Sequence, residues 1–195
     1  MLPERISVKF FVNDEDAVAT SALIPVFHRW IRERSVPGLP IDVADYKHVP
    51  DGPGVLLMGH EGDYAWDGRY GRLGLVYKHK REWTTETFAG RLNQVLERAK
   101  QAVELFQAAP ELQGISFQAD EIELSFPDRL NIPNRPETLA ELQDTITAVL
   151  QDQYPDKTAT LTHVHTEARR PFTVKVSLAP AAQLFETAGI LLRRL

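Results

Sequence analysis

Residues 63–77 read DYAWDGRYGRLGLVY and predict a β-hairpin. Asp67-Gly68 stands between two runs of residues with strand character, and an Asp-Gly pair tolerates the positive φ angles that a tight hairpin turn needs. A hairpin joins antiparallel strands that follow one another in the chain. The stretch therefore favours a largely antiparallel sheet over the parallel sheet of a doubly wound fold.

The segments on either side of this hairpin show strand and helix patterns that are intermixed with hairpins and do not alternate regularly. Apolar residues alternate along 6–12, and a continuous apolar run at 55–58 is typical of a central strand covered on both faces. Apolar residues at helical spacing mark helices at 23–31 and 88–106. Thr84 could cap the second of these helices. The remaining predicted elements are a strand at 41–44, a second hairpin with a turn or bulge at Ala119-Asp120, a helix from Pro136, strands at 158–165 and 172–178, and a final helix over 180–192. We predict an α+β fold with a mixed, mainly antiparallel sheet packed by three to four amphipathic helices.

The composition is that of an ordinary globular protein and excludes several classes. The chain has 195 residues and a net charge of −5, which suits one domain over 1–195 or two lobes over 1–109 and 110–195. The absence of cysteine excludes a disulfide framework and thiolate chemistry. The acidity argues against a nucleic-acid partner, and the longest apolar run is far shorter than the ~20 residues that span a membrane. We expect a cytoplasmic protein that binds neither nucleic acid nor membranes.

The strongest candidate site lies in a glycine-rich segment, because seven of the 11 glycines fall between Gly52 and Gly74. The apolar run at 55–58 is bracketed there by side chains that can bind ligands: Asp45, Tyr46, His48, His60, Glu61, Asp63 and Tyr64. Imidazole and carboxylate groups can form an acid-base pair or hold zinc, manganese or iron, although the same residues are common in polar turns. We predict a ligand-binding site without assigning a metal or cofactor. A zincin helix would need a histidine where Tyr64 stands.

Other clusters give weaker indications. Residues i and i+2 of a strand point to the same face, so His163 and His165 could reach one metal, but no third ligand is identifiable. The basic clusters at 78–81, 169–170 and 193–194 are interspersed with acids and are typical of solvated surface. The polar loop at 127–134 favours helix capping. The chain contains no phosphate loop, dinucleotide-binding glycine motif or nucleophile elbow.

Residues 45–64, DYKHVPDGPGVLLMGHEGDY, carry a resemblance to known sequences. Together with Asp120-Glu121-Ile122 and Asp128-Arg129-Leu130, this stretch resembles an uncharacterised conserved family of bacterial proteins. The resemblance implies no activity, cofactor or partner, and it directs attention to the glycine-rich segment.

These features favour a non-catalytic module that binds a ligand or associates with another protein or a second copy of itself. The alternative is a metal-assisted or acid-base enzyme that uses the cluster at 45–64. That alternative requires His48 and His60 to converge with a carboxylate in one pocket. A third hypothesis is an assembly factor with Trp30, Trp66 or Trp83 at an interface, since aromatic residues are enriched in contact patches.

Overall fold

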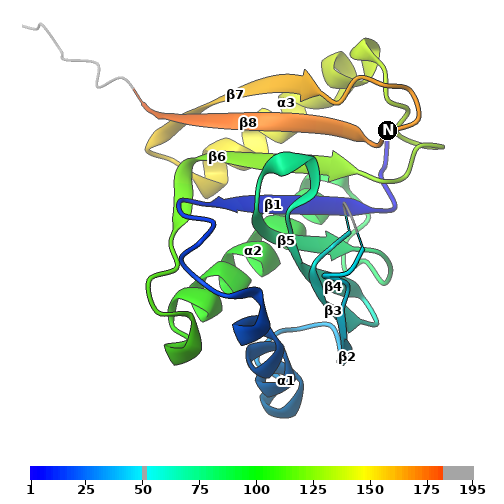
Figure 1. Cartoon of the computed structure of the whole chain (residues 1–195). Coiled ribbons are helices and arrows are strands. Elements are labelled where there is room, and N and C mark those ends of the chain that lie inside the picture. Colours follow the sequence, from blue (N-terminus) through cyan, green and yellow to red (C-terminus); the bar gives the residue numbers. More distant parts are fainter. Residues whose placement is uncertain (50–51, 182–195) are drawn as a thin grey trace, which may run out of the picture.

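The computed structural model describes residues 1–49 and 52–181, and over these residues the chain has the predicted α+β fold (Figure 1). The strands are β1 (Ile6–Val12), β2 (Pro40–Asp45), β3 (Val55–Gly59), β4 (Gly62–Asp67), β5 (Gly74–His79), β6 (Phe117–Phe126), β7 (Lys157–Val164) and β8 (Phe172–Pro180). The helices are α1 (Leu23–Glu33), α2 (Phe88–Gln107) and α3 (Pro136–Gln153). The strands form one antiparallel sheet in the order β2-β3-β4-β5-β1-β6-β8-β7. None of these helices has the length and apolarity needed to cross a bilayer.

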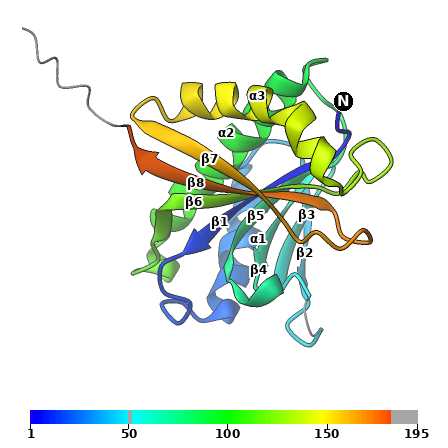
Figure 2. The same cartoon turned by 90° about the horizontal axis from the view of Figure 1, so that it is seen from above.

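The helices pack on one face of the sheet, where the core lies. α1 contacts β2 and β3, α2 contacts β1 and β5, and α3 contacts β7. Figure 2 shows α2 and α3 on the same side of the sheet. Trp30 of α1 meets Phe27 and Phe106 edge-to-face at 5.3 and 5.2 Å, a geometry that adds to the energy of burial. Trp30 and Trp66 are each only 2% exposed, so the interface predicted for them is wrong: both belong to the core.

The opposite face of the sheet, which we call the open face, carries rows of polar side chains and has none of α1, α2 and α3 packed on it. The strand register aligns a lysine and three hydroxyl residues in one row across β5, β1, β6 and β8: Lys78, Ser7, Ser125 and Thr173. In the next row Lys9 lies opposite Glu123, and Glu123 lies opposite Lys175. Cross-strand neighbours have Cβ atoms about 5 Å apart, so each row is a line of adjacent polar side chains.

Two strand predictions are corrected. β3 is not central, because it lies beside the edge strand β2, and its buried residues alternate with the half-buried Leu56 and Met58. Its continuous apolar run therefore does not mark a strand covered on both faces. The predicted second hairpin is also wrong, because 117–126 forms the single strand β6. An irregularity in its pairing with β1, between Phe10 and Val12, accompanies the change of parity that suggested a turn.

The connections also differ from the prediction. β4 and β5 pair as the expected hairpin, but residues 68–73 form a longer loop in place of a turn centred on Asp67-Gly68. α2 begins at Phe88, and its cap is Thr87, whose hydroxyl accepts the amide hydrogen of Gly90. The start of the helix predicted over 180–192 belongs to β8 at Pro180, and 182–192 lies outside the described residues.

Gly54 and Gly71 provide a matched test of how closely the turn before β3 packs on β4. Both have left-handed backbones, with φ of +63° and +72°. A Cβ at Gly54 would collide with the carbonyl oxygen of Trp66, whereas nothing lies within 4 Å of one at Gly71. We expect Gly71→Ala to cost about 1 kcal/mol of unfolding free energy. Gly54→Ala should cost about 3 kcal/mol because the backbone must also move. Urea unfolding measures both costs, and equal values would contradict this packing.

Candidate functional site

The predicted site residues separate into two groups at opposite ends of β3. Asp45, Tyr46 and His48 lie where β3 begins, and the rings of Tyr46 and His48 stack at 6.4 Å. His60 and Glu61 lie where β3 ends. The five residues of β3 extend over about 16 Å. The convergence of His48 and His60 that the enzyme hypothesis requires is therefore not formed. Ligand binding by either group stays a prediction.

The second group is occupied by ion pairs within the chain. These pairs are Glu61 with Arg98 (2.8 Å) and Asp63 with Lys80 (2.7 Å), and Nε2 of His60 lies 2.6 Å from Oε1 of Glu82. Asp63 also accepts the amide hydrogen of Gly59 at 3.2 Å. The carboxylates at this end of β3 thus tie the β3–β4 turn to α2 and to the residues that follow β5.

A buried polar chain runs inward from Glu61. Arg98 donates to the hydroxyl of Tyr77 at 3.0 Å, and this hydroxyl lies 2.8 Å from Nδ1 of His79. Burial raises the pKa of Tyr77 to about 12 and lowers the pKa of His79 to about 4. Nε2 of His79 and the hydroxyl of Tyr64 are buried and have no hydrogen-bond partner among the described residues.

The assignment of 78–81 to solvated surface is therefore wrong for His79, which is 0% exposed. Its ring lies 4.0 Å from that of Trp83. The alternation of β5 could have revealed this, because His79 shares a face with the buried Leu75 and Tyr77.

The two histidines near the end of β7 do not share a face. β7 ends at Val164, and His165 has a left-handed backbone with φ of +55°. His163 Nε2 lies 2.6 Å from Asn134 Oδ1, whereas His165 Nε2 lies 3.5 Å from Glu123 Oε2 on the open face. The shared-face prediction is wrong because the strand ends between the two residues. Among the described residues, no three His, Asp or Glu side chains are grouped to hold a metal ion.

Two loops fold over the open face and meet there. They are the β4–β5 loop, residues 68–73, which crosses in front of β1 in Figure 1, and the β7–β8 loop, residues 165–171. The rings of Tyr70 and His165 lie 4.2 Å apart. The guanidinium group of Arg170 lies 4.6 Å from the centre of the Tyr70 ring. Contacts between the two loops thus enclose part of the open face.

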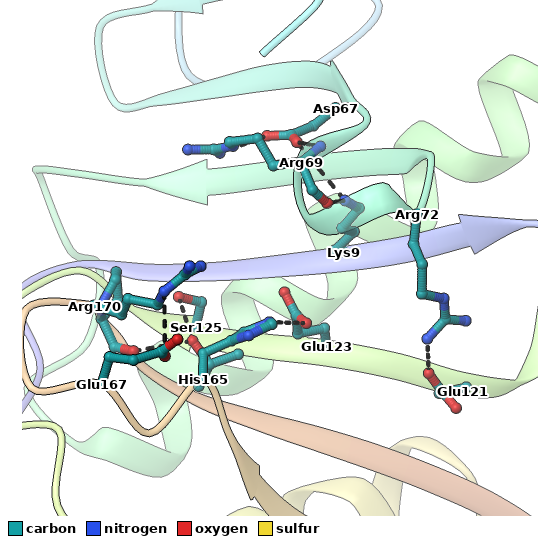
Figure 3. A network of polar contacts seen from close by, with 12 residues as sticks. Lys9, Asp67, Arg69, Arg72, Glu121, Glu123, Ser125, His165, Glu167 and Arg170 are labelled. Carbon is teal, nitrogen blue, oxygen red and sulfur yellow. Dashed lines mark hydrogen bonds and ion pairs between the residues drawn. The ribbon is translucent and has the colours of Figure 1, made fainter. Parts of the chain in front are cut away.

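Asp67 holds the β4–β5 loop from beneath. It is 1% exposed and accepts hydrogen bonds from the backbone amide and Nε of Arg69, both at 2.7 Å. Its second cation is Lys9, whose Nζ lies 3.7 Å from Oδ1. The Lys9 side chain is 7% exposed, and burial lowers its pKa. Figure 3 shows these three side chains gathered under the loop.

A second set of contacts lies toward β8. Arg72 pairs with Glu121 and lies 3.6 Å from the centre of the Phe11 ring. Lys175 lies 3.9 Å from the same glutamate. Figure 3 shows Arg72 reaching Glu121 and, farther along β6, His165 reaching Glu123.

Two small hollows flank these contacts. The first, which we call the Lys78 hollow, has a volume of about 150 Å³ and is lined in part by Lys78, Ser7, Ser125 and Thr173. The second, the Lys175 hollow, has a volume of about 140 Å³ and is lined in part by Lys175, Arg72, Glu121 and His165. Both include Lys9, Arg69, Tyr70 and Glu123. Their combined lining has five cationic side chains and three carboxylates, although the whole chain has a net charge of −5.

The open-face site was missed at the sequence level because it depends on long-range strand pairing. Glu121 and Glu123 share a strand face by simple alternation, which is usually a sign of solvent exposure. Only the pairing of β6 with β1 and β8 brings Glu123 between two lysines. A scan against protein-family models finds no match, and a search of curated proteins finds none either.

Proposed function

We propose that this protein is a non-catalytic module that associates with another protein through the open face of its sheet, and that the partner presents acidic side chains. The proposal rests on one observation: a sheet face with no α-helix packed on it among the described residues, whose polar side chains are ordered by ion pairs and by two loops that cover part of the face. The separation of His48 from His60 supports a role without catalysis. We also propose a cytoplasmic location, with which the absence of cysteine is compatible.

Side chains on the open face are already held in place, and this reduces the free-energy cost of association. Binding costs free energy when mobile side chains become fixed. Lys9, Asp67 and Arg69 are already fixed by mutual hydrogen bonds and ion pairs, and Tyr70 packs against the β7–β8 loop. A partner would therefore meet a surface that needs little further ordering.

The size of the hollows favours a protein over a metabolite. Sites for drug-sized ligands usually have volumes of roughly 300–1,000 Å³. The hollows here, of about 150 and 140 Å³, are each suited to one side chain. A protein surface can supply two such side chains at once.

The charge of the lining favours an acidic partner. Cations outnumber carboxylates five to three around the two hollows, so the local field attracts anions. A second copy of this chain docking face to face would bring like charges together, which is costly. The proposed partner is thus a different protein.

Hexaglutamate is a suitable probe for this proposal. We expect it to bind at low ionic strength, as measured by fluorescence anisotropy, and to bind more weakly as salt is added. Lys175→Glu should weaken binding about tenfold, which corresponds to about 1.4 kcal/mol. Lys47→Glu is the matched control, because the Lys47 side chain is 43% exposed and that of Lys175 is 41% exposed. Equal weakening by the two substitutions, or no binding at all, would contradict the proposal.

A further inference from the structure

The Lys78 hollow contains hydrogen-bond donors that the fold leaves available. Ser7 lies between Lys78 and Ser125 in the strand register, and Ser125 lies opposite Thr173. The Thr173 hydroxyl lies 3.2 Å from Ser125 Oγ and 3.1 Å from the carbonyl oxygen of Pro171, so this row has an internal contact. No described residue accepts a hydrogen bond from the Ser7 hydroxyl. Two serine hydroxyls and an amine therefore line one side of the hollow.

Lys78 is a cation without a partner in the part of the chain that the structure describes: no carboxylate there lies within 4.0 Å of its amine. Asp63, which lies opposite Lys78 on β4, pairs instead with Lys80 at 2.7 Å. Lys78 is half-buried, and burial lowers its pKa. An anion in the hollow would offset this cost of burial.

The two carboxylates that line the hollow do not cancel its attraction for an anion. Asp67 is 1% exposed and is occupied by Arg69 and Lys9. Glu123 lies opposite Lys9 in the strand register and 3.5 Å from His165. Lys9 and Arg69 both contact Asp67, so the lining has three cations against two carboxylates, and among the described residues Lys78 is the cation that contacts neither carboxylate.

We infer that the Lys78 hollow is a binding site for a single oxyanion, and that the partner fills it with the carboxylate of an aspartate or glutamate side chain. The inference rests on the proposed function for the source of the carboxylate. Lysine amines and serine hydroxyls are donors suited to a carboxylate or phosphate. A volume of about 150 Å³ accommodates such a group with a short alkyl stem.

Acetate and inorganic phosphate test the hollow itself at constant ionic strength. We expect acetate to shift the backbone amide NMR signals of residues 7, 78, 125 and 173 in a saturable manner. Lys78→Gln should weaken this binding at least tenfold, and Lys78→Arg should preserve it within about threefold because it keeps the charge. Lys47→Gln is the control, since Lys47 pairs with Asp45 at 2.9 Å outside the hollow, and its effect should be less than twofold.

The outcomes separate the inference from the proposed function. No saturable shift with either anion, or equal weakening by Lys78→Gln and Lys47→Gln, overturns the inference. Binding of phosphate without acetate overturns its assignment to a carboxylate. If hexaglutamate binds the wild type and Lys78→Gln leaves that affinity unchanged, the inference fails while the proposed function stands. If acetate binds through Lys78 but hexaglutamate does not bind, the oxyanion site stands and the proposed function fails.

Discussion

Replacing Asp67 by asparagine is expected to lower the free energy of unfolding by about 3 kcal/mol, because it removes the carboxylate from a buried pair. Lys9 would remain buried with a positive charge and would lose the carboxylate with which it forms an ion pair. Arg69 would lose its charged acceptor, so the β4–β5 loop would loosen as well. Urea unfolding at pH 7 measures the loss.

A second substitution tests the cause of that loss. Lys9→Met in the Asp67→Asn background removes the unpaired charge and keeps an apolar stem of similar length. We expect stability to return to within about 1 kcal/mol of the wild type, because replacing both partners of a buried pair is often nearly neutral. Asp120→Asn serves as the exposed control and should change stability by less than about 0.5 kcal/mol. If Asp67→Asn behaves like this control, the buried pair does not stabilise the protein.

The protein is also expected to lose stability between pH 6.5 and pH 4 because of His79. Its folded-state pKa is about 4, below the ordinary value of 6.5, so the unfolded chain binds a proton that the folded chain excludes. The stability that neutral His79 contributes is fully present above pH 6.5 and is lost as the pH falls toward 4. From pH 7 to pH 4.5 we expect a loss of about 2 kcal/mol.

Unfolding free energies of His79→Gln and His163→Gln isolate this contribution. Burial lowers the pKa of His163 too, so its effect has the same sign. Three carboxyl groups have lowered pKa values, and the stability that they contribute is lost mainly below pH 4. They belong to Asp45, Glu111 and Asp128. We expect His79→Gln to remove most of the slope between pH 7 and pH 4.5 and His163→Gln to leave most of it. An unchanged slope in His79→Gln would refute the assignment.

The regular elements could be predicted because their evidence is local. Two-residue alternation identified β1, and 3.6-residue spacing identified α1, α2 and α3. The glycine-rich segment was correctly placed around β3 and the β4–β5 hairpin. At Gly54, close packing against β4 is sufficient to explain the glycine.

The open-face site could not be predicted because its contacts join distant parts of the chain. Lys9 of β1 meets Asp67 at the end of β4 and Glu123 of β6 only after the sheet has formed. Tyr70 and His165, whose rings meet over this face, both have a left-handed backbone, which no sequence pattern indicated. His60 and Glu61 were predicted as site residues because they bracket an apolar run in a glycine-rich segment, which is local evidence of the same kind.

Hexaglutamate carrying a nitroxide label at one end tests the central claim most directly, because the label broadens the NMR signals of nearby residues. We predict broadening in the β4–β5 loop, in the β7–β8 loop and along β1, β6 and β8. Signals of residues 45–48 and 60–61 should remain sharp. Broadening confined to 45–48 or 60–61, with the open face unaffected, would contradict the account.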